Sequence, residues 1–387
     1  MDFALPDELR MLRTTLRRFV EQELIPLEKD YMHREEGLPP EIRKALEQKV
    51  QDLGLWAYSA PVELGGAGLG ALANCVVVEE VNRATVGDDI FGPNVPNLKT
   101  LASHCNAEQK ENYLYPCVKG EKEACFALTE PGAGSDAAAI QTTAVRDGDN
   151  YILNGTKTFI SHAQDADFAL VYAVTDKEKR ARGGITCFIV DMGTPGFEIT
   201  RIIETMGDGR PCELVFNNCV VPAKNVLGEV GQGFRVAQGR LGWRRVEIAA
   251  QCLGAAERCL KMMVDYAGQR VTFGEPLANR QAVQWMIADS SIEIHATRLM
   301  TYDAAVKWDE GQEIRQEASM VKLYASEMAC RVVDRAMQVH GGLGYTRDLP
   351  IEKMYRNLRL WRIVEGPSEI HRFIIARNIL RGLWSGE

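Results

Sequence analysis

The stretch YILNGTKTFISHAQDADFALVYAVT, residues 151–175, decides the fold class. It contains the short runs YILNG, KTFISHA and FALVYAVT, which are rich in β-branched and aromatic residues and are separated by turn residues. This pattern predicts β-strands. Just before it, residues 147–150 read DGDN and separate TTAVRD from YILNG, as the connection of a β-hairpin does. CFALTEP, GITCFIVDM, FEITRI and CELVFNNCVV repeat this pattern on either side. We therefore expect a compact β domain over residues 124–228.

The residues before this segment follow a helical period. Apolar residues recur three and four positions apart at Leu9, Leu12, Leu16, Phe19 and Val20, which predicts one buried helix face. A second helix is expected to begin at Pro39-Pro40 and to end at Gly54. Its buried face would carry Ile42, Leu46, Val50 and Leu53. We expect residues 1–123 to form a helical domain.

Helical spacing returns after the β segment and continues to the end. Long amphipathic stretches cover roughly residues 234–269, 281–309, 317–340 and 368–383. Long helices joined by short loops predict an antiparallel four-helix bundle over residues 229–387. The predicted fold class is therefore α+β and multidomain: an N-terminal helical domain, a middle β-barrel or sandwich domain, and a C-terminal helical bundle.

Bulk composition excludes several function classes. With 46% hydrophobic and 25% charged residues, the chain is typical of globular proteins, and no run of about 20 apolar residues could span a membrane. The net charge of -8 argues against a nucleic-acid surface. The start, MDFALPDELRML, lacks the basic residues and apolar core of a signal peptide. We expect a cytoplasmic protein, or a mitochondrial matrix protein whose targeting segment is already absent.

Ten cysteines occur without a CxxC pair and without the histidine spacing of a zinc site. Several stand where apolar residues belong, such as Cys252 and Cys259 in an Ala/Leu/Met-rich stretch. We interpret them as small buried thiols in a reducing compartment, and we expect neither disulfides nor a metal site.

The segment CFALTEPGAGSD, residues 125–136, is the first candidate for ligand binding. Thr129 and Ser135 supply hydroxyls, while Gly132 and Gly134 allow backbone N–H groups to approach a flat or anionic ligand. It is not a P-loop, because no GK[ST] follows, and the dinucleotide spacing GxGxxG is absent. A glycine-rich turn between strands remains an equally good interpretation.

The segment TKTFISHA, residues 156–163, is the second candidate. On a strand, Phe159 and Ser161 would lie on one face and could stack on and hydrogen-bond to a ring system. Taken alone, this alternation is explained better by core packing.

The third candidate, VEGPSEIHR, begins at Val364. Glu365 precedes Gly366-Pro367, and Ser368 suits the start of the last helix. A carboxylate beside a tight turn after the apolar run LWRIV would be partly desolvated, which raises its pKa and makes it a stronger base. The alternative is a surface carboxylate at a helix start.

Two further segments carry polar or flexible residues. In QVHGGLGY the glycines could lie against a ligand or form a helix C-cap, and His340 is interpreted as structural. In QRVTFGEPLANRQ, Arg270 and Gln281 could address a pyrophosphate, with Phe273 as an aromatic anchor. Arg245, at the head of an apolar helix, could reach a ligand or solvent.

The order of these segments is more specific than any one of them. LTEPGAGSD, the FIS strand, RVTFG…Q, QVHGGLGY and VEGPSEIHR together resemble the acyl-CoA dehydrogenase family over nearly the whole chain. The resemblance implies a flavoprotein oxidoreductase of fatty acid metabolism, acting in steps such as those of beta-oxidation. It also implies the helix–β–helix fold derived above, assembled as a homotetramer or dimer, and a cofactor, FAD, between the β domain and the C-terminal helices.

The resemblance assigns cofactor contacts residue by residue. The isoalloxazine ring would meet Phe126, Leu128, Thr129, Ser135, Phe159 and Ser161, with Ser161 near flavin N5. The diphosphate and ribityl region would meet Arg270, Phe273 and Gln281. Gln338 and Gly342 would come from a neighbouring subunit and lie near the adenosine end. Pro367 and Glu369 occupy the adenine side, where they depart from the EGTSQ-like turn of the best-known members. The pattern EGPSE is closer to the long- and branched-chain, ten-and-eleven-type members and their bacterial relatives.

The resemblance also assigns the chemistry. Glu365 matches the catalytic base of the larger branch, whereas the other branch carries its glutamate where this chain has Arg244. Ser135, Arg245 and Gly366 match positions that contact acyl-CoA. Glu365 would take the α-proton while a hydride leaves the β-carbon for flavin N5, giving a trans-2-enoyl-CoA. A flavin hydroxyl and the backbone N–H of the base would stabilise the enolate. Electrons would pass to an electron-transfer flavoprotein.

Other functions share this pattern. An acyl-CoA oxidase or a flavin hydroxylase would use oxygen, although a hydroxylase has no need of a base at Glu365. An enoyl-CoA reductase would run the same chemistry in reverse. A flavin-free scaffold that keeps only the fold is the alternative outside enzymology.

Overall fold

The computed structural model describes residues 4–35, 37–92 and 95–384. The chain divides into two compact units. One, here called the helical unit, comprises Met1–Leu53, Leu69–Ile90 and Gly242–Glu387, and the other, here called the β unit, comprises Gly54–Gly68 and Phe91–Leu241. The three-domain boundaries after residues 123 and 228 stay a prediction.

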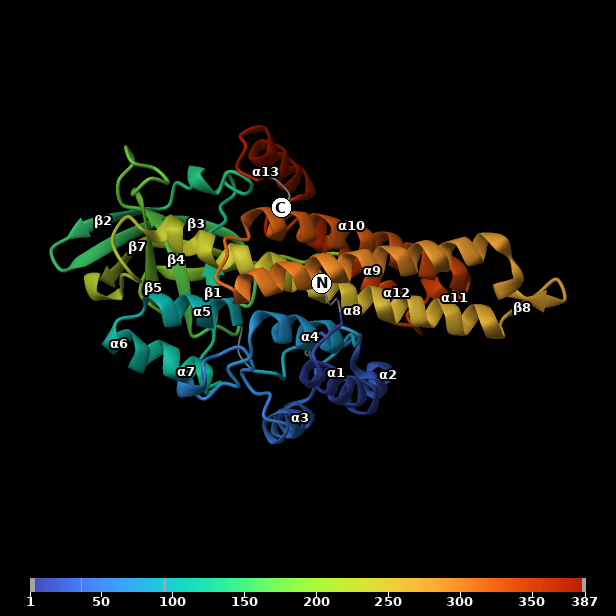
Figure 1. The fold of residues 1–387 in the computed structure, drawn as a ribbon. Coiled ribbons are helices and arrows are strands. Elements are labelled where there is room, and N and C mark those ends of the chain that lie inside the picture. The colour runs from blue at the N-terminus through green and yellow to red at the C-terminus, as the bar shows by residue number, and fades with distance from the viewer. Residues whose placement is uncertain (1–3, 36, 93–94, 385–387) are drawn as a thin grey trace. The chain divides into compact units, whose positions relative to one another are not determined.

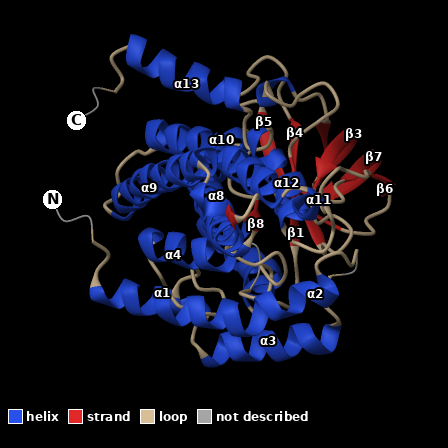
Figure 2. Ribbon diagram, turned by 90° about the vertical axis from the view of Figure 1, so that its right-hand side faces the viewer, coloured by secondary structure: helices blue, strands red, loops and turns tan. Residues whose placement is uncertain are grey.

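The β unit is built on a seven-stranded sheet, shown in red in Figure 2. The strand order is β1-β4-β2-β3-β7-β6, and β5 pairs with β4. β1 and β2 pair with β4 in parallel, and the other pairs are antiparallel. The strands are β1 (Ala124–Ala127), β2 (Thr143–Asp147), β3 (Asn150–Ile160), β4 (Phe168–Val174), β5 (Ile185–Asp191), β6 (Phe197–Ile202) and β7 (Cys212–Pro222).

Strand β4 lies at the centre of this unit because both of its faces are buried. Phe168, Leu170 and Tyr172 enter one hydrophobic cluster, whereas Ala169 and Val171 enter another. A strand buried on both faces has a continuous apolar run, which FALVYAV provides. Helices α5 (Val95–His104), α6 (Ala107–Gln109) and α7 (Tyr115–Val118) also belong to this unit.

The predicted strands are present, with one correction. YILNG and KTFISHA are a single strand, β3, whose register with β7 shifts between Leu153 and Gly155 and again between Lys157 and Ile160. Phe159 lies at the second shift with φ +57°, and Ser161 lies in the turn after the strand. The prediction that Phe159 and Ser161 share one face of a regular strand is therefore wrong. The predicted hairpin is confirmed, because Asp147 pairs with Asn150 and Gly148 has φ +58°.

The described part of the helical unit contains an N-terminal group and a C-terminal group of α-helices (Figure 1). The first group is α1 (Asp7–Phe19), α2 (Glu28–Tyr31), α3 (Pro40–Asp52) and α4 (Ala71–Val81). The second is α8 (Gly233–Gln269), which belongs to this unit from Gly242 onward, α9 (Gln281–Asp309), α10 (Arg315–His340), α11 (Gly342–Tyr345), α12 (Ile351–Leu358) and α13 (Ser368–Leu380). The hairpin of β8 (Val271–Thr272) and β9 (Glu275–Pro276) connects α8 to α9. Figure 1 shows α8, α9 and α10 running side by side.

The helices approach closely where side chains are small. A Cβ on Gly254 of α8 would lie 2.1 Å from the Glu79 carbonyl oxygen of α4, so only glycine allows this crossing. The predicted bounds of α9 are confirmed, and those of α3, α8 and α10 differ from prediction by a few residues. The last helix ends at Leu380, not Leu383. Leu53, predicted to be buried, follows the end of α3 and is 41% exposed.

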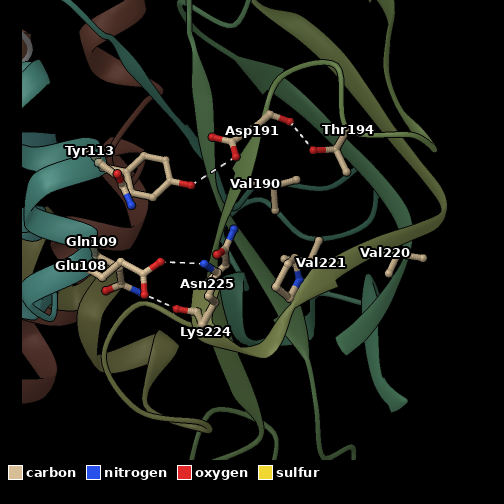
Figure 3. A pocket seen from close by; sticks show the side chains of 12 residues that line it. Glu108, Gln109, Tyr113, Val190, Asp191, Thr194, Val220, Val221, Lys224 and Asn225 are labelled. Atoms are coloured by element: carbon tan, nitrogen blue, oxygen red, sulfur yellow. Dashed lines mark hydrogen bonds and ion pairs between the residues drawn. The ribbon is translucent and has the colours of Figure 1, made fainter. Parts of the chain in front are cut away.

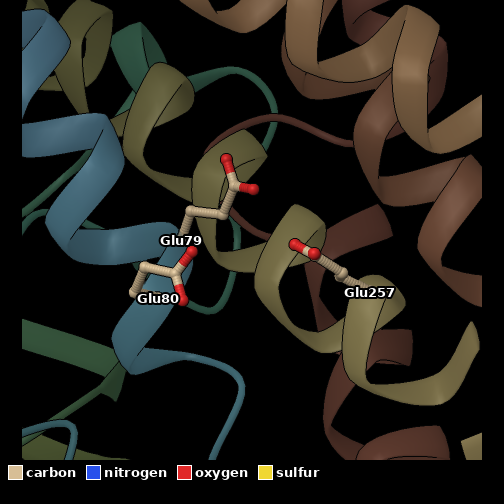
Figure 4. Close-up of side chains that lie close together, drawn as sticks. All are labelled: Glu79, Glu80 and Glu257. Atoms are coloured by element: carbon tan, nitrogen blue, oxygen red, sulfur yellow. The ribbon is translucent and has the colours of Figure 1, made fainter. Parts of the chain in front are cut away.

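A buried network of charges ties α1, α4, α8 and α9 together. Figure 4 shows Glu79, Glu80 and Glu257, whose carboxylates are spaced closely enough to hold a metal ion. Each is instead paired with arginine: Arg298 contacts Glu79 at 2.7 Å and Glu257 at 3.0 Å, and Arg17 contacts Glu80 at 2.6 Å. We interpret the cluster as a salt-bridge network.

The ten cysteines are free thiols, and nine of them are buried, as predicted. Among residues 4–35, 37–92 and 95–384, none of the helices combines the length and apolar character that crossing a bilayer requires.

Candidate active site

The turn that carries Glu365 has an unusual backbone. Glu365 has φ +55° and Gly366 has φ +95°, so two consecutive residues are in the left-handed region. Non-glycine residues rarely adopt this region, and they do so where the surrounding structure enforces it, often at functional sites. A 3-10 helix, Arg359–Arg362, precedes the turn, and α13 follows it. The Glu365 side chain is half-buried.

Two cationic side chains hold the carbonyl groups of this turn. Arg245 of α8 donates from Nε to the Glu365 carbonyl oxygen at 3.2 Å. Lys322 of α10 donates from Nζ to the Gly366 carbonyl oxygen at 2.7 Å. Arg245 was expected to reach a ligand or solvent, but its Nε is used by the protein backbone. The turn is therefore fixed by two helices at consecutive peptide groups.

His371, in the first turn of α13, explains why residue 366 is glycine. Its ring is fully buried, and a Cβ on Gly366 would lie 3.2 Å from its Nε2. Burial, together with the nearby charges of Arg245 and Lys322, lowers the pKa of His371 to about 3. The imidazole is therefore neutral at physiological pH.

Arg245 and Lys322 also interact electrostatically with the Glu365 carboxylate. Burial lowers the pKa of Lys322 to about 8, while Cys252, Glu365 and Glu327 oppose this decrease. Burial also lowers the pKa of Arg245, and Glu365 opposes it. Glu365 thus lies within electrostatic reach of both cations.

The residues after the turn begin the last helix differently from prediction. Pro367 is the N-cap residue, and the Ser368 hydroxyl donates to Glu327 Oε1 at 2.7 Å instead of capping the helix. Ser368 is the first residue of α13, as expected, but it anchors α13 to α10. Pro367 is half-buried and Glu369 is exposed.

In the β unit, a buried ion pair between Glu130 and Lys157 holds the segment 125–136. Glu130 accepts hydrogen bonds from the backbone N–H groups of Gln141 at 2.6 Å and Thr142 at 2.9 Å. Lys157, fully buried on β3, donates to Glu130 Oε1 at 2.7 Å and to the Leu128 carbonyl at 3.1 Å. Burial lowers the pKa of Lys157 to about 8, and Glu130 opposes this shift. The pair fixes the path of the loop.

The outer side of that loop is open. A Cβ on Gly132 or Gly134 would meet no atom within 4 Å, and Ser135 is exposed. Phe159 is 62% exposed, and its backbone has φ +57°. An exposed aromatic ring and an open glycine loop in the same unit suit a flat ligand, and these residues therefore fit a flavin.

Three predicted residues of this segment lie deeper. Phe126 is half-buried, with the Arg240 guanidinium 4.1 Å above its ring and Tyr172 5.0 Å away. Leu128 is buried in the core of the β unit. Thr129 is half-buried, and its carbonyl accepts a hydrogen bond from the Thr158 N–H at 2.9 Å.

The residues predicted to bind the diphosphate lie around the β8–β9 hairpin of the helical unit. Phe273 is 98% exposed, Arg270 is exposed immediately after α8, and Gln281 is the exposed first residue of α9. Gln338 and Gly342 are exposed where α10 ends and α11 begins. His340 between them is buried, bonds to the Ala336 carbonyl at 2.8 Å and stacks on Tyr266. Its structural role is confirmed.

A cavity of about 220 Å³ lies elsewhere in the β unit (Figure 3). Its lining includes Glu108, which pairs with Lys224 at 2.6 Å, and Tyr113, which bonds to Asp191 at 3.2 Å. It contains none of the predicted site residues, and it is smaller than typical ligand pockets. We interpret it as a crevice between packed elements.

Prediction from sequence missed four residues that shape these segments: Glu130, Lys157, Lys322 and His371. One signal was available, because Lys157 and Lys322 are lysines at positions where the strand or helix period calls for a buried residue. Such insertions mark buried charges that need a partner.

Comparison with known proteins gives one consistent result. Residues 6–121, 125–219 and 231–380 match the N-terminal, middle and C-terminal domains of acyl-CoA dehydrogenases. The chain is 43% identical to (R)-benzylsuccinyl-CoA dehydrogenase of Thauera aromatica, over 98% of this chain and 97% of that protein. It is 39% identical to acryloyl-CoA reductase (NADH) of Anaerotignum propionicum, over 98% and 96%. The structure of butyryl-CoA dehydrogenase from Megasphaera elsdenii matches with a TM-score of 0.88 and 35% identity, over 98% of this chain and 100% of that one.

Proposed function

Because the chain belongs to the acyl-CoA dehydrogenase family, we propose that it removes hydrogen from the α- and β-carbons of an acyl-CoA thioester, with Glu365 as the general base. The observation that carries this proposal is the turn at Glu365, whose two carbonyl groups are held by Arg245 and Lys322. A base must be held in one orientation to act on a weakly acidic C–H. The product would be a trans-2-enoyl-CoA.

The family uses FAD, which, when bound here, supplies the acceptor for the hydride from the β-carbon. We assign its ring contacts to the β-unit residues Phe126, Leu128, Thr129, Ser135, Phe159 and Ser161. We assign its diphosphate and adenosine contacts to Arg270, Phe273, Gln281, Gln338, Gly342, Pro367 and Glu369. The exposure of Phe273 and the open glycine loop support these assignments.

In the proposed mechanism Glu365 acts twice. Its carboxylate takes the α-proton, and its backbone N–H donates to the thioester carbonyl, on which negative charge develops. Gly366 and Ser135 would contact the acyl-CoA. Arg245 would also contact the acyl-CoA, through the guanidinium N–H groups that do not bond to the Glu365 carbonyl.

The reverse reaction is the second candidate. The relative from Anaerotignum propionicum is named a reductase at 39% identity, and the same base would then donate a proton to the α-carbon. An oxidase is the third. Anaerobic addition of acyl-CoA followed by admission of air separates the dehydrogenase from the oxidase. Both lose their oxidised flavin absorbance without oxygen, but in air the dehydrogenase regains it slowly, whereas the oxidase regains it rapidly and forms peroxide.

We infer an electron-transfer flavoprotein as the acceptor and a homotetramer, or a dimer, as the assembly. Large exposed apolar side chains support self-association: Phe273 at 98%, Leu380 at 86% and Tyr345 at 81%. Such side chains on one unit are typical of surfaces that a second copy covers. We also propose a cytoplasmic location for the protein.

The variant Glu365→Gln tests the proposal. It keeps the size and the backbone of the turn but cannot accept a proton, so kcat should fall by at least about 10²–10⁴-fold. FAD content and the affinity for an enoyl-CoA should not change. Glu313→Gln, at a 77% exposed carboxylate, is the matched control. Near-normal turnover of Glu365→Gln would place the base elsewhere.

A further inference from the structure

We propose that Lys322 is a positioning residue of the catalytic turn: by holding the Gly366 carbonyl, its ammonium group sets where the Glu365 carboxylate and backbone N–H point. The inference rests on the proposed function, since it gives Lys322 a role only if Glu365 is the base.

The burial of Lys322 is the first argument. Its side chain is fully buried on α10, and its Nζ donates to the Gly366 carbonyl at 2.7 Å. A buried ammonium costs free energy that an apolar side chain of similar length does not, so such a lysine is weak evidence for stability. What it provides is a short, directional bond to one peptide group of the turn.

The backbone of the turn is the second argument. Left-handed conformations at Glu365 and Gly366 need support from several directions. Arg245 holds the first carbonyl from α8, Lys322 holds the second from α10, and the His371 ring packs against Gly366 from α13. Releasing the second carbonyl lets the peptide between residues 366 and 367 rotate, and Glu365 turns with it.

The charges around Lys322 are consistent with this role. Arg245 and Cys252 on α8, Glu327 on α10, and Glu365 in the turn all act on its ammonium, and Lys322 in turn acts on His371 of α13. Because His371 is neutral, it does not replace the lysine as a cationic donor to the turn.

Another lysine offers a matched control. Lys353 of α12 is 7% exposed and donates from Nζ to the Met32 carbonyl, in the same unit but at no predicted site residue. Lys322→Met and Lys353→Met each remove a buried ammonium–carbonyl bond. Both variants should lose stability, so stability alone does not report on positioning.

The experiment measures the proton-transfer step directly. Holoenzyme with its flavin reduced under anaerobic conditions is mixed with a saturated acyl-CoA in D2O, so that hydride transfer is blocked. Exchange at the α-carbon breaks the C–H bond, passes the proton to Glu365 and returns a deuteron from solvent. The exchange rate is followed by mass spectrometry, and kcat and KM are measured separately on the oxidised holoenzyme.

We expect Lys322→Met to keep FAD and KM but to lower kcat and the exchange rate together by about 10- to 100-fold, the effect of one charged hydrogen bond. Lys322→Gln, which keeps a shorter N–H donor, should show a smaller decrease. Lys353→Met should exchange at the wild-type rate. If Lys322→Met exchanges as fast as Lys353→Met, the inference is overturned.

Should Lys322→Met fail to fold, Lys322→Gln decides, and a wild-type exchange rate there overturns the inference. Glu365→Gln, measured in parallel, distinguishes failure of the positioning role of Lys322 from failure of the proposed base, Glu365. Loss of exchange in Glu365→Gln with normal exchange in Lys322→Met removes only the positioning role. Normal exchange in Glu365→Gln removes the proposed base and the inference with it.

Discussion

Adding one methyl group at Gly366 should disturb the turn that carries Glu365 more than its small size suggests. Gly366 has φ +95°, where an alanine costs about 1–2 kcal/mol of conformational free energy. The added Cβ would lie 3.2 Å from Nε2 of His371 and 3.7 Å from Nη2 of Arg245. A contact of 3.2 Å requires a shift of a few tenths of an ångström. Because the His371 ring is fully buried, we expect the turn to move, and Glu365 with it.

The control for this variant is Gly311→Ala. Gly311 has φ +76°, and a Cβ there would meet no atom within 4 Å, so the backbone cost is similar and the steric contact is absent. We expect Gly366→Ala to lose about 2–3 kcal/mol of unfolding free energy and Gly311→Ala about 1–2 kcal/mol. Only Gly366→Ala should lower kcat, by roughly 10-fold, since a shift of 1 Å costs about 10²-fold.

The assay combines urea unfolding of the holoenzyme with steady-state turnover of an acyl-CoA. If the two variants lost equal stability and both kept wild-type kcat, the turn would tolerate displacement. The geometric argument for Glu365 would then be wrong.

Two further predictions concern stability. Arg298→Met leaves the carboxylate of Glu79, which is 1% exposed, without its main cation, and should lower the free energy of unfolding by about 3–5 kcal/mol. The control Arg10→Met, at the surface, should change it by less than about 0.5 kcal/mol. Equal losses of both variants in urea titrations would show that the buried network contributes nothing. Burial raises the pKa of Cys187 from its ordinary value of 9.0 to about 12, so the folded state keeps a proton that the unfolded state releases. The contribution of this thiol to the free energy of unfolding is fully present below about pH 9 and is lost as the pH rises toward about 12. In that range it falls by about 1.4 kcal/mol per pH unit. Cys187→Ala should therefore flatten the decrease of unfolding free energy between about pH 9 and about pH 11, and an unchanged slope would contradict the assignment.

Periodicity alone predicts much of the fold. α9 begins and ends at the predicted residues, and the hairpin at Gly148 follows from DGDN between two β runs. These features depend on neighbours in the chain, which is the information that a sequence pattern contains. α12 is not predicted, because its eight residues follow a glycine-rich segment interpreted as a loop.

The candidate site depends on contacts that sequence spacing does not encode. Lys322 and Gly366 are 44 residues apart, and their bond exists only because α10 packs beside the turn. The shift that gives Phe159 its left-handed φ arises from the pairing of β3 with β7, which no local pattern shows. Glu365 itself is predicted from sequence only by resemblance to a family, since its local residues are compatible with an ordinary helix start.

The role of Glu365 as the base is tested by anaerobic mixing of the holoenzyme with acyl-CoA thioesters of graded chain length, with flavin absorbance as the readout. We expect at least one thioester to bleach the wild-type flavin rapidly, and we expect Glu365→Gln, with the same thioester bound, to stay oxidised. Bleaching of Glu365→Gln at the wild-type rate would contradict it.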